Sequence, residues 1–249
     1  MRLPASSRSR SRLAIVLVVI LAVALVGTAL LRRGKATRSV RRTVPATTLA
    51  VIPTPALGVA PSALAVPAAL TDVGLDLRAG PVAVPLVLRI PALDVDADVV
   101  GVGITSENVM DAPMGGPGDP VWQQAFWYRG SAIPGAASTA LIAGHIDGGG
   151  RLALFAYLDE LQPGDAIVLH DTRSGLDVRF AVTSSESYTL DEAADPAVLA
   201  QIYGAGPVAG TWPQPSVDGL AHLTLVTCAG TYTNGTHDHR LVVYATRVA

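Results

Sequence analysis

The chain has 249 residues, 50% of them hydrophobic, with a formal net charge of −2 and a single cysteine. This length is enough for one or two domains, and one cysteine excludes an intramolecular disulfide. Ten basic residues and no acid lie in positions 1–42, so positions 43–249 carry a net charge of −12. A globular part of that sign is not expected to bind nucleic acid, whereas the basic end suits anionic lipid head groups.

Residues 13–31 form a nineteen-residue apolar run without a charge. At 1.5 Å per residue it would be about 28 Å long as a helix, close to the roughly 30 Å of a bilayer core. A cleavable signal peptide is the alternative, but its apolar core is shorter and ends at a small-x-small site. This run continues directly into Arg32 and Arg33. We therefore predict a basic tail over 1–12 and an uncleaved transmembrane helix over 13–31.

The basic residues around this run do not settle its orientation. Four basic residues precede it and six follow it. The positive-inside count therefore slightly favours the wrong side for an exported domain.

Residues 32–85 are predicted to be a linker, first basic and then rich in proline and alanine. Seven prolines lie between positions 43 and 85. Proline fixes φ and removes a ladder donor, so this density favours an extended tether with polyproline II character.

From residue 86 to 249, short apolar runs alternate with Gly, Pro and Asp, which is typical of a mostly β domain, either a barrel or a sandwich. Helices are predicted at 152–161, before Pro163 and Gly164, and at 193–203, where Pro196 is tolerated in the first turn. The strands are predicted at 86–90, 95–102, 139–143, 166–170, 178–183, 223–227 and 241–245.

The only cysteine, Cys228, ends one of these strands, and Arg240 begins the next after an eleven-residue loop. If the two strands pair as a hairpin, these two residues are neighbours at one edge of the sheet. A free cysteine at the end of an apolar strand is also a common core residue, and composition alone does not decide between the two interpretations.

His145 changes that balance because it stands just past the end of another strand, where a side chain lies at the rim of a sheet. A free thiol with a pKa near 8.5 is mostly protonated at neutral pH, so a nucleophilic cysteine benefits from a nearby histidine and a fixed positive charge. Arg240 can supply that charge and can donate hydrogen bonds to an oxyanion.

Three short motifs surround these residues: Thr224-Leu-Val-Thr-Cys228, Ala143-Gly-His-Ile-Asp147 and His239-Arg-Leu-Val-Val-Tyr244. They resemble motifs of a known family, the sortases, which are membrane-anchored cysteine transpeptidases of Gram-positive cell surfaces. Further segments resemble landmarks of the family in the same order: Arg89-Ile-Pro91, Trp127-Tyr-Arg-Gly130 and Leu161-x-Pro-Gly-Asp165. The resemblance covers about residues 86–249 and is greatest to class F, with class E next.

The resemblance implies an eight-stranded sortase-type β-barrel with one or two short helices. It implies that Cys228 cleaves an LPxTG-like sorting signal between Thr and Gly through a thioacyl enzyme, with His145 as general acid and base and Arg240 on the substrate and oxyanion. An amine of a peptidoglycan precursor or pilin would be the acceptor, and no metal or organic cofactor is needed. It also implies a cytoplasmic amino terminus and an extracellular catalytic domain on a single membrane span, despite the six basic residues that follow the run.

Three further residues are predicted to contact substrate or to support the site: Thr227 beside the nucleophile, Trp212 in the long 189–221 connection, and Asp147. Asp147 could orient His145 or simply be a turn residue before glycine. His237 and His239 could bind zinc together with Cys228, but structural zinc sites usually complete four ligands, so solvated loop histidines are the preferred interpretation.

Two other classes of function stay open. An L,D-type cysteine transpeptidase would need a histidine just before its cysteine, and none stands before Cys228. A non-catalytic, membrane-anchored β-barrel binding module would keep Cys228 buried and unreactive.

Overall fold

The computed structural model describes residues 76–107, 109–204 and 213–248, all within one unit of the chain, Pro55–Ala249. The predicted basic tail, the transmembrane helix at 13–31 and most of the linker lie outside these ranges. Within the three ranges, no helix combines the length and hydropathy needed to cross a bilayer.

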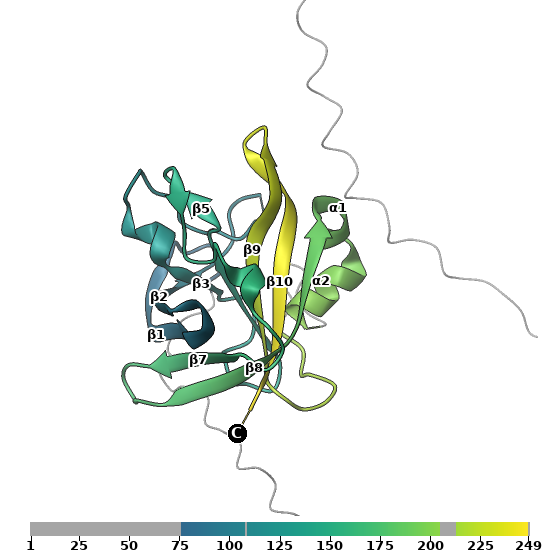
Figure 1. Ribbon diagram of the computed structural model, residues 1–249. Coiled ribbons are helices and arrows are strands. Elements are labelled where there is room, and N and C mark those ends of the chain that lie inside the picture. The colour runs from purple at the N-terminus through teal and green to yellow at the C-terminus, as the bar shows by residue number, and fades with distance from the viewer. Residues whose placement is uncertain (1–75, 108, 205–212, 249) are drawn as a thin grey trace, which may run out of the picture. The chain divides into compact units, whose positions relative to one another are not determined.

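Eight strands close into a barrel in the order β1-β2-β3-β4-β9-β10-β8-β7, which confirms the barrel and excludes the sandwich (Figure 1). Strands β2 and β3 pair in parallel, as do β4 and β9, and the other barrel pairs are antiparallel. The barrel strands are β1 (Val82–Ile90), β2 (Val95–Val102), β3 (Ala125–Tyr128), β4 (Thr139–Gly144), β7 (Ala166–Asp171), β8 (Asp177–Thr189), β9 (His222–Thr233) and β10 (Thr236–Arg247). A separate small sheet pairs β5 (Asp147–Gly148) with β6 (Arg151–Leu152).

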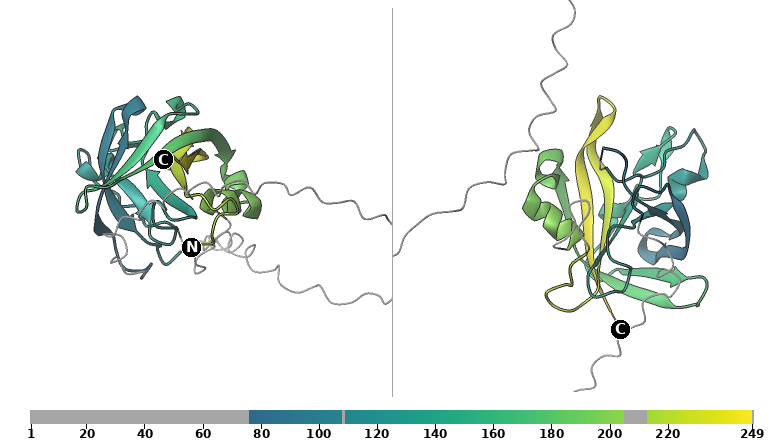
Figure 2. Two further views of the ribbon diagram at one scale, coloured as in Figure 1. Left: turned by 90° about the horizontal axis from the view of Figure 1, so that it is seen from below. Right: turned by 180° about the vertical axis from the view of Figure 1, so that it is seen from behind.

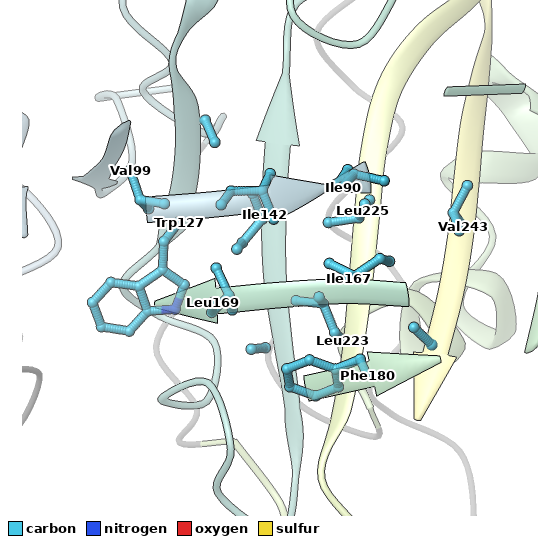
Figure 3. Close-up of a cluster of buried hydrophobic side chains, with 14 of the residues drawn as sticks. Ile90, Val99, Trp127, Ile142, Ile167, Leu169, Phe180, Leu223, Leu225 and Val243 are labelled. Carbon is cyan, nitrogen blue, oxygen red and sulfur yellow. The ribbon is translucent and has the colours of Figure 1, made fainter. Parts of the chain in front are cut away.

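The barrel is filled by apolar side chains that alternate along its strands (Figure 3). In β1, Leu86, Leu88 and Ile90 are buried while the residues between them are not, which is the period-two pattern of a strand with one face on the core. Trp127 and Phe180 are among the large side chains that complete this interior. Burial of one such side chain contributes about 1.5–3 kcal/mol, so the barrel interior is the main source of stability.

The described residues include ten that precede the predicted boundary at 86. Strand β1 starts at Val82, and Asp76 and Ala79 in front of it are bonded to the barrel by Arg129. Pro85 within β1 lacks a ladder donor, and the register of β1 on β2 shifts between Ala83 and Val87 around it. A bulged strand with a proline resembles a linker in sequence, which explains why residues 82–85 were assigned to the linker.

The predicted helix at 152–161 is wrong. The segment forms β6, turns and a short 3₁₀ helix at Leu158–Glu160. Its backbone amides are used elsewhere: Leu154 donates to the Trp122 carbonyl and Phe155 to the His145 carbonyl, at 2.9 Å each. These tertiary hydrogen bonds replace the intrahelical ones, so the apolar run ending before Pro163 and Gly164 was a misleading helix signal.

The second predicted helix exists but begins later than residue 193. A one-turn helix, α1 (Leu190–Ala193), is followed by α2 (Pro196–Tyr203), which Asp195 caps and in which Pro196 occupies the first turn as predicted. Helix α1 contacts β8 and β10, α2 contacts β4, and both lie on the side of the barrel next to the β9–β10 hairpin (Figures 1 and 2).

Candidate active site

The β9–β10 hairpin places Cys228 directly opposite Arg240 in the cross-strand register, which confirms that they are neighbours. The predicted eleven-residue loop between them is wrong, because both strands continue to a two-residue turn. Asn234 and Gly235 form this turn with φ of 53° and 87°, the left-handed pair typical of a type I′ hairpin. Cys228 and Arg240 therefore sit within a continuous ladder, and neither is on a loose loop.

A β-bulge follows Cys228 immediately. Between the pairs His239↔Ala229 and His237↔Tyr232, strand β9 has one residue more than β10, and Gly230 adopts φ of 77° there. Asp238 closes the bulge, because its Oδ1 accepts hydrogen bonds from the Thr231 amide and from His239 Nδ1, at 2.7 Å each. The bond from His239 lowers the pKa of the Asp238 carboxyl, with smaller contributions from the backbone. The backbone beside the thiol is thus fixed by an ionised side chain.

Parallel pairing of β4 with β9 brings His145 to the same edge of the barrel as Cys228. Ala143 pairs with Val226, so both strands reach this edge together. The Thr227 hydroxyl, which is buried, donates to the Gly144 carbonyl at 2.9 Å and so joins the residue before the cysteine to the residue before the histidine. The sequence predicted that Thr227 contacts the substrate. In the structure, its hydroxyl is hydrogen-bonded to the Gly144 carbonyl.

The imidazole of His145 is held on several sides. Its Nε2 lies 2.8 Å from the Pro113 carbonyl oxygen. A carbonyl can only accept, so Nε2 carries a hydrogen and Nδ1 is the nitrogen left to exchange a proton. The rings of Trp122 and Phe126 pack against the imidazole with edge geometry, at centroid distances of 4.8 and 5.2 Å. The tautomer and the ring plane are therefore set by the fold.

Arg240 is only partly committed to the protein. Its Nη1 donates to the His239 carbonyl at 2.8 Å and to the His237 carbonyl at 3.3 Å. Across the parts of the chain that the structure describes, the rest of the guanidinium has no hydrogen-bond partner. Cys228 opposite it is a free, half-buried thiol. A fixed cation at this position can bind a developing oxyanion.

The remaining predicted residues have other surroundings. Asp147 has its Oδ2 3.5 Å from Nε2 of His237, so the structure pairs it with His237 and orients His145 through Pro113 instead. Within residues 76–107, 109–204 and 213–248, no three His, Cys, Asp or Glu side chains cluster as metal ligands, so His237 and His239 form no zinc site with Cys228 there. Trp212 lies outside the described residues.

Sequence reasoning missed Pro113, Trp122 and His237 as members of this site. Pro113 acts through its backbone carbonyl. Every residue has such a carbonyl, so the residue type gives no signal of this role. Trp122 lies in the 103–124 connection, where no strand or helix was expected around it. His237 was considered, but only as a metal ligand.

Comparison with known proteins identifies the fold. A family model described as Sortase domain matches residues 88–248. A lid mutant of sortase A from Corynebacterium diphtheriae is similar in structure, with 20% identity over 70% of this chain and 74% of that chain and a TM-score of 0.46. Sortase C-1 from Actinomyces oris shows 19% identity over 66% of this chain and 73% of that chain, with a TM-score of 0.44.

A search of curated proteins finds no match to this chain. The Sortase domain match spans well over half of the sequence and includes Cys228, His145 and Arg240. The chain therefore belongs to the sortase family of cysteine transpeptidases.

Proposed function

We propose that this sortase cleaves an LPxTG-like sorting signal between Thr and Gly and transfers the protein to an amine of the cell wall. The observation that carries the proposal is the cross-strand pair of Cys228 and Arg240, with His145 brought to the same barrel edge by the Thr227–Gly144 hydrogen bond. Nucleophile, cation and base then lie at one edge of the barrel, where a peptide carbonyl can react.

In the acylation step, the Cys228 thiolate attacks the threonine carbonyl carbon and forms the C–S bond. Negative charge collects on the carbonyl oxygen, where the free donors of Arg240 stabilise it. The C–N bond to glycine then breaks, and the leaving amine takes a proton from Nδ1 of protonated His145, because Nε2 stays on the Pro113 carbonyl. The products are a thioacyl enzyme, neutral His145 and the released carboxyl-terminal fragment.

In the transfer step, an incoming amine attacks the thioester carbonyl. Nδ1 of His145 accepts the proton that this amine loses, the C–S bond breaks, and the thiolate and imidazolium are restored. Water in place of the amine gives hydrolysis as a side reaction. A peptidoglycan precursor or a pilin is the acceptor that we propose, and the motif resemblance favours class F, with class E second.

Support for the substrate class comes from a relative. Sortase C from Clostridium perfringens has been solved with the C-terminal cell wall sorting motif. We extend that class of ligand to this chain as part of the proposal.

The chemistry is tested by incubating the full chain in detergent with a panel of LPxTG-like peptides and measuring its intact mass. The expected result is a mass increase equal to the peptide portion up to and including threonine, which is lost in Cys228→Ala and released by an added amine. If wild type and Cys228→Ala give the same spectrum with every peptide, the proposal fails and a non-catalytic binding module becomes the better interpretation.

We also propose that residues 13–31 anchor the chain in the membrane, with residues 1–12 in the cytoplasm and the catalytic domain outside. Because Cys228 is the only thiol of the chain, a membrane-impermeant maleimide tests this directly. It is expected to label the chain in intact, wall-stripped cells. Labelling that requires cell lysis would place the domain on the other side.

A further inference from the structure

A second histidine, His237, lies at this edge of the barrel in an unusual environment. It is buried, and among the residues that the structure describes neither of its ring nitrogens has a hydrogen-bond partner. A carboxylate oxygen of Asp147 approaches Nε2 to 3.5 Å, and the ring of Tyr232 packs at a centroid distance of 5.0 Å. Buried polar atoms in native proteins are nearly always hydrogen-bonded, so this imidazole calls for an explanation.

The position of the pair in the chain supplies one. Asp147 stands two residues after His145, in β5, and His237 stands three residues before Arg240, in β10. The carbonyl of His237 accepts a hydrogen bond from Arg240 Nη1. Strand β5 and the tip of the β9–β10 hairpin lie at the same end of the barrel in both side views (Figures 1 and 2). The pair thus connects the segment after His145 to the strand of Arg240.

We propose that Asp147 and His237 form a positioning pair that holds the His145 segment against the strand that carries Arg240. A small movement shortens the 3.5 Å approach to a charge-assisted hydrogen bond, in which Nε2–H of His237 donates to the Asp147 carboxylate. The pair touches no reacting atom: Asp147 acts through His145, and His237 acts through the backbone carbonyl that Arg240 binds. This inference rests on the roles given above to His145 and Arg240.

Two linkages would then fix His145 relative to the hairpin. One is the buried bond from Thr227 to the Gly144 carbonyl, on the amino-terminal side of His145. The other is the Asp147–His237 pair, on its carboxyl-terminal side. Displacement of a catalytic group by about 1 Å can cost as much as 10²-fold in rate, so loss of one linkage has a measurable cost.

The primary variant is Asp147→Ala, because the side chain is 52% exposed and its removal does not threaten the barrel. We expect it to lower kcat/KM for the sorting peptide about tenfold, mostly in kcat. His237→Leu should cause a similar loss. His237→Gln, which keeps an amide donor, should stay within about threefold of wild type. The double variant Asp147→Ala with His237→Leu should be no worse than the poorer single variant.

A matched control exists at the opposite end of the barrel. His170 and Asp177 form another histidine–aspartate pair, 2.9 Å apart, at the β7–β8 turn. Asp177→Ala removes the same chemical group from the same kind of pair without touching the site. It should leave kcat/KM unchanged.

A second measurement needs no peptide. The rate at which iodoacetamide alkylates Cys228 in the full chain is followed across pH, because thiolate formation reports the charges around the sulfur. We expect the profile of Asp147→Ala and His237→Leu to be displaced from that of wild type and of Asp177→Ala. A pair that only stabilised the fold would lower the melting temperature without displacing this profile.

The outcomes separate the two proposals. Losses that multiply in the double variant, or an undisplaced alkylation profile in folded Asp147→Ala, overturn the positioning pair. If no peptide acylates the wild-type chain, the proposed sorting reaction fails, and the alkylation profiles still decide whether the pair positions the residues around the thiol. Displaced profiles together with the tenfold losses in kcat/KM support both.

Discussion

Two arginines mark two regions of the barrel, and both donate to backbone carbonyls. Arg129, just after β3, is 2% exposed and donates to the carbonyls of Asp76 and Ala79 at 2.8 and 2.6 Å. Arg240, opposite the cysteine, is half-buried, and toward the described residues it donates through Nη1 alone. Burial of a guanidinium is costly unless its donors are used, so Arg129 is committed to structure. The donors that Arg240 leaves unused make it available to a ligand.

The surroundings of Arg129 are tightly packed, whereas those of Arg240 are partly exposed to solvent. Gly103, near Arg129, has no room for a side chain, since a Cβ there would lie 1.8 Å from the carbonyl oxygen of Leu77. The backbone at Leu77 is therefore packed closely against Gly103. At the other region, Cys228 and Arg240 face each other at a ladder position where both are half-buried. Tight packing marks the structural arginine, and partial exposure marks the one that we propose binds the substrate.

Replacement of Arg240 tests the functional half of this comparison and should have the largest effect. We expect Arg240→Lys to lower kcat/KM by about 10²–10³-fold, because lysine keeps the charge but loses the planar fork of donors for the oxyanion. The free energy of unfolding should change by less than about 1 kcal/mol. Peptide-transfer kinetics and urea unfolding measure the two quantities. A stability loss as large as the activity loss would make Arg240 a structural residue like Arg129.

Replacement of Arg129 should give the opposite result. Arg129→Met leaves carbonyls of Asp76 and Ala79 without their charged donor, and we expect a loss of about 2–4 kcal/mol in the free energy of unfolding. The activity of each folded molecule should stay close to wild type, because the guanidinium is not at the site. Urea unfolding of the full chain, followed through its tryptophans, checks the first point. A kcat that falls in fully folded Arg129→Met would contradict the separation of the two regions.

Much of the barrel could be predicted because its strands alternate clearly. The runs at 95–102 and 166–170 were placed within one residue of their observed bounds, and the pairing of Cys228 with Arg240 followed from the hairpin alone. Errors arose where tertiary hydrogen bonds decide the backbone. The segment at 152–161 is an apolar run that ends before Pro163 and Gly164, as a helix often does, but its amides at 153 and 155 donate to the carbonyls of Ile146 and His145. Strand β3 (Ala125–Tyr128) is fully buried and short, so it showed no alternation.

The candidate site also contains some residues that the sequence indicates and others that it does not. Cys228, His145 and Arg240 could be proposed as catalytic residues because their residue types and strand-end positions carry chemical meaning. The groups that hold them could not. The Pro113 carbonyl has no side-chain signature, and the partner of Asp147 depends on a bulge at Gly230 that shifts the strand register before His237. Positioning groups come from the register of distant strands, which a single sequence does not contain.

Thr227 tests whether buried polar groups at the site serve structure, as at Arg129. Thr227→Val removes the hydroxyl and leaves the Gly144 carbonyl without its 2.9 Å donor, so we expect a loss of about 1–2 kcal/mol in stability. A smaller activity loss should accompany it, because Gly144 precedes His145. Thr227→Ser keeps the hydroxyl and is the matched control. Unfolding by urea and peptide-transfer rates are compared for the three proteins. Equal stability of the valine variant and wild type would show that the bond is dispensable.

Asp238 gives the smallest expected effect, which depends on pH. The hydrogen bond from His239 lowers the pKa of this carboxyl in the folded chain below its unfolded value, which is about 3.9. A lowered folded pKa stabilises the fold above the unfolded pKa, and this contribution is lost as pH falls through the folded pKa. Asp238→Asn keeps the acceptor oxygen for Thr231 and removes the charge. The melting temperature of wild type should therefore exceed that of Asp238→Asn between about pH 5 and 7, and the difference should shrink as pH falls below about 4 towards the lower folded pKa. A difference that stays constant down to pH 3 would mean that the carboxylate charge of Asp238 has no part in holding the bulge beside Cys228.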